Sequence, residues 1–176
     1  ELLPALNKTA KENNLILERK SISECVSRIA FYGAGCTKSL SLIVSEALFH
    51  IFPHALINVE GDLLGAAHAV CGNEAGIACI LGTGANSCLY DGKQIVSNIP
   101  PLGYILGDEG SGAVLGKHLL NGIFKGDLST EIRDLFLDWC GLCYSEIIDK
   151  VYRQPLANRF LANNARFIKE NLQYAE

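Results

Sequence analysis

Residues 55–71 read ALINVEGDLLGAAHAVC and carry the strongest indication of the fold. Residues 55–60 form an apolar run of strand length, and Gly61 and Asp62 follow it directly. Residues 63–71 continue with small and apolar residues of helical character. A strand that ends in glycine and aspartate and leads into a helix is typical of α/β proteins, whose ligands bind at the carboxyl ends of parallel strands.

The preceding stretch supplies another strand and helix. Residues 28–32 are apolar and lead into a glycine loop at 33–35, which predicts a buried strand. Residues 39–52 carry apolar residues three and four positions apart, which predicts a helix that ends before Pro53. Strand, helix, strand and helix in succession predict an α/β fold with a parallel sheet.

The pattern changes after Gly72. Apolar runs at 76–81, 86–90 and 94–97, separated by glycine-containing turns, predict an antiparallel meander. We therefore expect residues 1–72 to form the remainder of an N-terminal lobe and residues 73–176 to form a C-terminal lobe. The C-terminal segment is predicted to be helical, with one helix expected at about 113–124 and others within 130–139, within 144–152 and within 155 to the end.

The composition excludes several classes of protein. Of the 176 residues, 49% are hydrophobic and 19% are charged, which excludes an intrinsically disordered chain. A net charge of −4 provides no electrostatic footprint for nucleic acid. No apolar run approaches the roughly 18 residues that a membrane span requires. We therefore expect no nucleic-acid partner, no membrane partner and a cytoplasmic location.

Single residue types give further expectations. The seven cysteines are an odd number scattered through apolar segments, which favours buried, reduced thiols. The four histidines share no metal-ligand spacing, so we expect no zinc site. The chain begins at Glu1 and contains no methionine, which predicts that both ends of the full protein lie outside it. Residues 1–27 are partly helix-prone, with breaks expected at Asn7, Asn13 and Asn14.

Two glycine loops imitate nucleotide-binding fingerprints. Residues 33–39 read GAGCTKS and end in Lys-Ser, but a phosphate loop of NTPases needs glycine where Tyr32 and Thr37 stand. Residues 82–87 read GTGANS, but a strand follows them, whereas a Rossmann turn opens a helix. The second loop is instead expected at the tip of a hairpin, where its amides and the Thr83 hydroxyl can face a phosphate.

Carboxylates next to glycine are the candidate catalytic and binding groups. Asp62, at the carboxyl end of a strand, can accept a proton from an attacking hydroxyl, or it can cap the helix that follows. Asp108 and Glu109 can likewise cap a helix, and Asp108 can accept hydrogen bonds from a polyol. The residues alone leave these alternatives open.

Three motifs together resemble a known family. They are VEGDLLGAA at 59–67, ILGTGANS at 80–87 and LGDEGSG at 106–112. The chain resembles the N-acetylglucosamine kinases and the related activator-type ATPases named BadF, BadG, BcrA and BcrD, within the sugar kinase, Hsp70 and actin superfamily. The resemblance extends over residues 29–159. It implies a two-lobe, ribonuclease H-like (actin-like ATPase) fold with a helical C-terminal segment.

The resemblance also implies an activity and its residues. The activity is ATP- and Mg²⁺-dependent phosphorylation of a sugar, N-acetylglucosamine or a related hexosamine. Asp62 would be the catalytic base. Gly82, Thr83 and Gly84 would bind phosphate, and the sugar side would comprise Ala85, Asn86, Leu102, Gly103 and Asp108. Dimers are common in this family, so a homodimer is one expectation.

The sequence departs from the family in particular places. The first phosphate motif and the adenine motif are absent, and Leu102 stands where the vertebrate type has an aromatic ring. Residues 151–159 (VYRQPLANR) resemble a bacterial branch of the family. Arg153 and Arg159 are surface or lid residues on this basis, and we expect the surface role.

Two other functions stay open. One is an activator ATPase of a dehydratase system, which would need an iron–sulfur cluster, although Cys140 and Cys143 form a lone CxxC that favours buried thiols. The other is a non-catalytic regulator that binds sugar.

Overall fold

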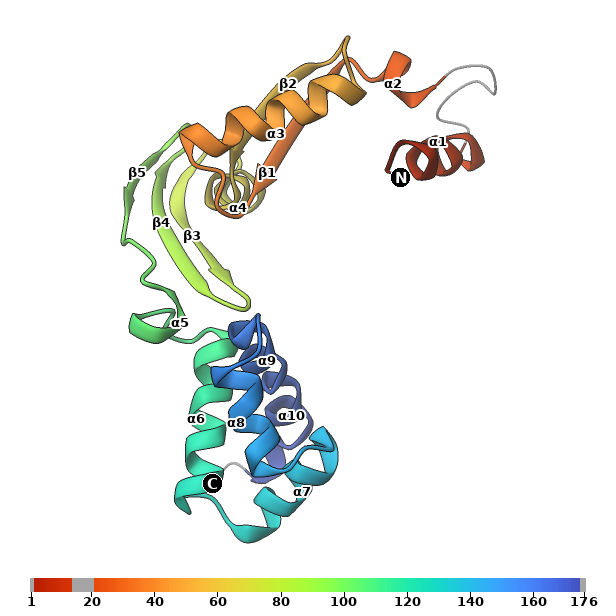
Figure 1. The fold of residues 1–176 in the computed structure, drawn as a ribbon. Helices are drawn as coiled ribbons and strands as arrows, with labels where there is room; N and C mark the ends of the chain where they lie inside the picture. The colour runs from red at the N-terminus through yellow and green to blue at the C-terminus, as the bar shows by residue number, and fades with distance from the viewer. Residues whose placement is uncertain (1, 14–20, 175–176) are drawn as a thin grey trace. The chain divides into compact units, whose positions relative to one another are not determined.

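The computed structural model describes residues 2–13 and 21–174. The chain divides into two compact units, Glu1–Gly76 with Asp91–Ile95, and Ile77–Tyr90 with Val96–Glu176. Figure 1 shows the helices and strands of each unit, and their mixture confirms the predicted α/β class. None of the described helices is both long and apolar enough to cross a membrane. The lobe boundary near Gly72 stays a prediction.

The first unit begins with α1 (Leu2–Glu12), which passes through Asn7 without a break. The break predicted at Asn7 is therefore wrong. Its side-chain oxygen is engaged elsewhere, because it accepts hydrogen bonds from the backbone N–H of Ile22 at 2.6 Å and from the Ser21 hydroxyl at 3.3 Å. Asn13 follows the helix end, as predicted, and Asn14 lies outside the described residues.

The predicted strand–helix–strand–helix order is confirmed in this unit. Strand β1 (Arg28–Gly33) pairs in parallel with β2 (Leu56–Gly61), so that Gly33 lies opposite Gly61. Helix α3 (Lys38–Ile51) joins the two strands and packs on β2, and α4 (Asp62–Cys71) contacts both strands.

The prediction that residues 28–32 are buried is wrong. Phe31 and Tyr32 of β1 are both 37% exposed. Within the described residues, β1 has β2 as its strand neighbour, and a two-stranded sheet covers little of its own faces. An apolar run therefore predicted the strand correctly but not its burial.

The meander is confirmed. Strands β3 (Ala75–Leu81), β4 (Ala85–Asp91) and β5 (Ile95–Asn98) lie in the order β3-β4-β5, joined by three-residue connections that are too short for parallel neighbours. Asp91 holds the second turn, because its carboxylate accepts hydrogen bonds from the backbone N–H groups of Gln94 and Lys93, both at 2.8 Å. These bonds lower the pKa of Asp91 below its ordinary value.

Helices make up the rest of the second unit. They are α5 (Gly103–Leu106), α6 (Gly112–Lys125), α7 (Thr130–Cys140), α8 (Tyr144–Tyr152), α9 (Ala157–Asn163), α10 (Ala165–Glu170) and the 3-10 turn Leu172–Tyr174. The core that joins α6, α7, α8 and α10 contains Leu119, Ile123, Phe136, Ile147 and Phe167. The rings of Phe136 and Phe167 meet edge to face with their centroids 5.2 Å apart.

Two features differ from the predicted helices. The short α5 was not predicted, because four residues carry no helical period. Helical structure was expected within residue 155 to the end without a predicted break, and it is divided at Asn164, which is 1% exposed. The Cβ of Asn164 lies against Gly116 of α6, so packing rather than local preference positions this break.

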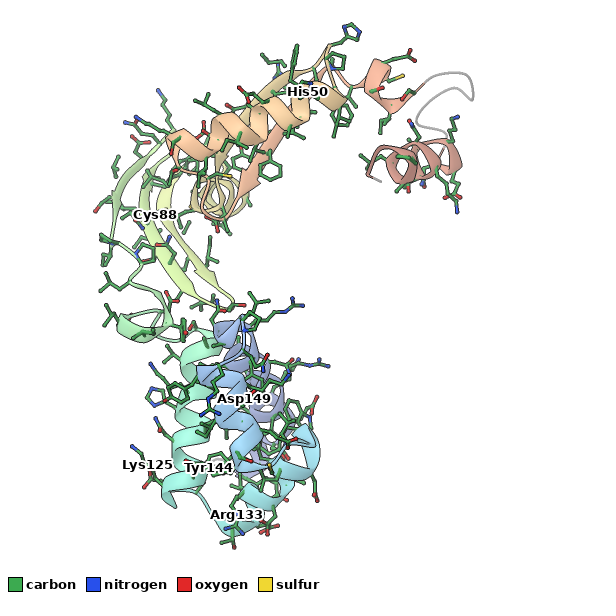
Figure 2. All side chains as sticks on the ribbon, viewed as in Figure 1. His50, Cys88, Lys125, Arg133, Tyr144 and Asp149 are labelled. Atoms are coloured by element: carbon green, nitrogen blue, oxygen red, sulfur yellow. The ribbon has the colours of Figure 1, made fainter. Side chains whose placement is uncertain are left out.

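The expectation of buried thiols is mostly wrong. Cys88 on β4, labelled in Figure 2, is buried, but Cys25, Cys79 and Cys143 are exposed. Cys143 begins α8 in a capping box, since its backbone N–H donates to the Glu146 carboxylate at 2.8 Å. That bond, together with one from the Cys143 side chain, lowers the pKa of Glu146.

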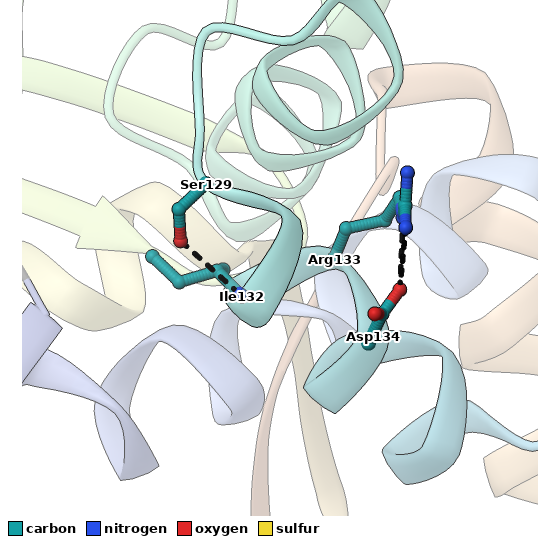
Figure 3. A network of polar contacts seen from close by, with 4 residues as sticks. All are labelled: Ser129, Ile132, Arg133 and Asp134. Atoms are coloured by element: carbon teal, nitrogen blue, oxygen red, sulfur yellow. Dashed lines mark hydrogen bonds and ion pairs between the residues drawn. The ribbon is translucent and has the colours of Figure 1, made fainter.

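The hydroxyl of Ser129 caps α7. It accepts a hydrogen bond from the backbone N–H of Ile132 at 3.3 Å (Figure 3). Replacing Ser129 with Ala should lower the free energy of unfolding by about 1 kcal/mol, measured by urea denaturation, because the helix loses an acceptor for one terminal N–H. Asp134→Asn is the control, because the exposed ion pair of Arg133 and Asp134 contributes little. Equal stability of the two variants would show that the cap is unimportant.

Candidate active site

The 82–84 loop is fixed to the start of α6. The backbone N–H of Gly112 donates to the Gly82 carbonyl at 2.8 Å, and that of Ala113 donates to the Thr83 carbonyl at 3.2 Å. The buried Ser111 hydroxyl accepts from the N–H of Val114 at 3.3 Å and is the N-cap. The loop therefore satisfies helix N–H groups that would otherwise lack partners, and the helix holds the loop in place.

The alternative roles of Asp108 and Glu109 as helix caps are wrong, because Ser111 performs that function. Asp108 instead lies against the 82–84 loop. A Cβ atom on Gly84 would stand 2.8 Å from the Asp108 Oδ2, so glycine at 84 allows the carboxylate to approach the loop backbone. Asp108 itself has a φ of +60°, a left-handed conformation that costs a non-glycine residue about 1 kcal/mol. The second and third motifs thus meet at this contact.

A first cavity lies on one side of the loop, with a volume of about 690 Å³. We call it the cationic cavity, because the basic residues Lys150, Arg159 and Arg166 line it together with Gly82 and Thr83. Gly82 and Thr83 are exposed to solvent, so a ligand can reach them. Backbone amides, a hydroxyl and cationic side chains are groups that bind phosphate.

A second cavity, the Asp108 cavity, has a volume of about 400 Å³. Four of the residues predicted on the sugar side line it, namely Ala85, Asn86, Leu102 and Asp108, whereas Gly103 does not. The amide oxygen of Asn86 accepts hydrogen bonds from the Asn98 side chain and the Ser87 backbone N–H, at 2.8 and 2.9 Å. Its NH₂ group is thereby left to donate to a ligand.

Further polar groups in the Asp108 cavity were missed as sugar-side residues. Ser87, Glu109 and Cys79 also line it. Ser87 directly follows the predicted Asn86 in β4, and Glu109 follows the predicted Asp108 in its loop, so adjacency was the available signal. The sequence gives no such signal for Cys79, because a cysteine in an apolar strand is typical of a core residue.

Asp62 lies in the first unit, at the start of α4. Asp62 is the first residue of α4 after the N-cap Gly61, so the alternative role as N-cap is wrong. Its Oδ1 accepts from the backbone N–H of Leu63 at 2.9 Å, and its side chain is partly buried. A carboxylate in the first turn also interacts favourably with the helix dipole. Its action on a ligand of the second unit stays a prediction.

Another cavity contains neither the 82–84 loop nor Asp108. It has a volume of about 710 Å³ and lies between α6 and α8, where Tyr144 and Lys125 line it (Figure 2).

Within the described residues, no three His, Cys, Asp or Glu side chains converge on a position for a metal ion.

Comparison with known proteins yields a structural relative. No protein-family model and no curated protein matches the chain. A crystal structure from Porphyromonas gingivalis, of a protein provisionally named an N-acetylglucosamine kinase, matches with a TM-score of 0.84 and 50% identity. The match covers 86% of this chain and 54% of that protein. The chain is similar to an N-acetylglucosamine kinase-like protein. It spans about half of that relative's length.

Proposed function

We propose that the protein containing this chain transfers the γ-phosphoryl group of ATP to a hydroxyl of N-acetylglucosamine or a related hexosamine. One observation carries the proposal: Gly82 and Thr83 border a cavity lined by cations, while their neighbours Leu81 and Ala85 border a cavity lined by carboxylates. A phosphate donor and a polyol acceptor would then flank one loop. The similarity to a protein named as such a kinase supports the same assignment.

The proposed reaction requires positioning and charge neutralisation more than covalent chemistry. We assign Asp62 as the base that accepts the proton of the attacking sugar hydroxyl. The hydroxyl oxygen forms a bond to the γ-phosphorus, the bond from that phosphorus to the bridging oxygen breaks, and ADP leaves. The two-lobe, ribonuclease H-like architecture that the family resemblance implies is part of this proposal.

The residues of the second unit fit a phosphate donor. Gly82 has no side chain to obstruct the loop, and Thr83 offers a hydroxyl beside the cationic cavity. Mg²⁺ neutralises phosphate charge in such reactions and is usually held by one or two carboxylates together with the phosphates themselves. Binding of Mg²⁺ in this reaction therefore does not require three protein ligands.

The residues of the Asp108 cavity fit a sugar. The carboxylates of Asp108 and Glu109 can accept hydrogen bonds from hydroxyl groups, and the Asn86 NH₂ group can donate one. Leu102, which is 61% exposed, supplies an apolar wall suited to a ring face or an acetyl methyl group. Cytoplasmic location and homodimer formation remain proposals.

The test is ADP release by the full-length protein with Mg-ATP and a panel of hexoses and N-acetylhexosamines. Release that depends on one amino sugar would support the proposal. Release without any sugar would favour an activator ATPase. Sugar binding without ADP release would favour a regulator, and either result would overturn the kinase assignment.

The exposed thiol of Cys79 gives a separate test of the sugar site. Because Cys79 lines the Asp108 cavity, bound N-acetylglucosamine should shield it from an alkylating reagent. At a sugar concentration about ten times the Kd, modification of Cys79 should slow about tenfold, since about one tenth of the sites stay empty. Peptide mass spectrometry measures the rate at each thiol. Cys143 is exposed and lines neither proposed cavity, so its rate should not change.

A further inference from the structure

Three helices each contribute one basic side chain to the cationic cavity. Lys150 belongs to α8, Arg159 to α9 and Arg166 to α10. Among the residues that the structure describes, no aspartate or glutamate lines the cavity, so none of these walls supplies a neutralising carboxylate. Three like charges around one cavity repel one another, and a bound anion relieves that repulsion.

The neighbouring carboxylate is already occupied. Asp149, labelled in Figure 2, lies 3.8 Å from the Arg153 guanidinium and accepts a hydrogen bond from the Gln154 side chain at 2.8 Å. Across the described residues, the ion pairs involve Lys8, Arg133 and Arg153. None of these pairs involves Lys150, Arg159 or Arg166. Lys150 interacts at longer range with the charge of Glu146, which itself accepts a hydrogen bond from the Cys143 backbone N–H at 2.8 Å. The exposed guanidinium groups of Arg159 and Arg166 are therefore available to a ligand.

The backbone that leads into Arg159 is strained. Leu156 borders the cavity and has a φ of +62°, which an L-residue with a side chain rarely adopts. Its carbonyl accepts the backbone N–H groups of Arg159 at 3.0 Å and Phe160 at 3.1 Å, so the strained residue begins the helix that carries Arg159. Such strain clusters at sites that clamp ligands.

We propose that Lys150, Arg159 and Arg166 bind the polyphosphate chain of ATP, the phosphate donor, and that the 82–84 loop forms another wall of the same site. The proposal rests on the proposed function and adds side-chain ligands to the loop. The cavity, at about 690 Å³, lies within the range of small-molecule sites. Guanidinium groups bind phosphate oxygens in pairs of hydrogen bonds, and three cations match several phosphates better than one.

The test compares binding of Mg-ATP and of inorganic tripolyphosphate to the full-length protein by calorimetry. Arg159→Gln and Arg166→Gln should each weaken both ligands about tenfold, as expected for a lost charge-assisted hydrogen bond, and the double variant should weaken them further. If the variants weaken ATP but tripolyphosphate does not bind to the wild type, the arginines recognise the nucleoside, and the polyphosphate assignment is wrong.

Arg153→Gln is the matched control. It removes the same charge from the same unit, but Arg153 pairs with Asp149 and does not line the cavity, so both affinities should stay unchanged. All substituted arginines are exposed, and thermal unfolding of the free variants checks that they fold. As a second measure, ATP affinity of the wild type should fall as salt rises, and less steeply in the double variant.

The outcomes separate this proposal from the kinase assignment. Unchanged ATP affinity in the double variant, or an equal loss in Arg153→Gln, would overturn the cationic site even if sugar-dependent ADP release persists. Tripolyphosphate binding that the variants abolish would support the site even if no sugar is phosphorylated.

Discussion

Replacing Asp62 with Asn is expected to reduce sugar-dependent ADP release by about 10²- to 10⁴-fold, the range that general-base catalysis contributes. The amide keeps the size of the carboxylate but cannot accept the proton of the attacking hydroxyl. Coupled assay of ADP release at saturating Mg-ATP and sugar measures the effect. The Kd for ATP should be unchanged, because the groups assigned to the phosphates lie at the 82–84 loop and the cationic cavity.

Stability and a second carboxylate serve as controls for Asp62→Asn. The loss of a charge in the first turn of α4 should cost about 0.3–1 kcal/mol of stability, which thermal unfolding detects separately from activity. Asp138→Asn removes an exposed helical carboxylate of the second unit and should retain full activity. A variant of Asp62 that turns over at a tenth of the wild-type rate or more would contradict its assignment as the base.

The sequence predicted the strands and helices that depend only on patterns of neighbouring residues. The apolar run before Gly61 and the helix after Asp62 were correct, because strand and helix periods are properties of neighbouring residues. The three-residue loop at 82–84 likewise predicted a hairpin rather than a crossover. Burial of Phe31 was wrong, because burial depends on what covers a strand, and residues close in sequence do not determine that.

Features that depend on packing were not predictable from local patterns. Helix α9 ends at Asn163, and its C-cap Asn164 is buried against Gly116, which lies 48 positions earlier in the chain. The cationic cavity combines residues from three helices with a hairpin loop, and the spacing of Lys150, Arg159 and Arg166 follows no motif. Arg159 was expected at the surface, and it is exposed. Its position at the cationic cavity was not predicted.

Replacing Gly116 with Ala is expected to lower the free energy of unfolding of the protein by about 2 kcal/mol. A Cβ on Gly116 would overlap the backbone carbonyl of Leu161, so α6 and α9 would have to separate. Overpacking of this kind costs about 1–3 kcal/mol, with backbone contacts at the upper end, and alanine returns about 1 kcal/mol of helix propensity. Urea denaturation, with the slope compared between variants, measures the change.

Gly122→Ala is the matched control, because both glycines lie inside α6. A Cβ on Gly122 would stand 2.9 Å from the Cγ of Leu128, so a side chain rather than backbone would have to shift. The gain of about 1 kcal/mol in helix propensity should offset much of this smaller packing cost and leave the Gly122 variant within about 1 kcal/mol of the wild type. Equal stability of the two variants would show that α6 and α9 are not in the close contact described. Because α9 carries Arg159, the separation caused by alanine at 116 should also weaken ATP binding, whereas alanine at 122 should not.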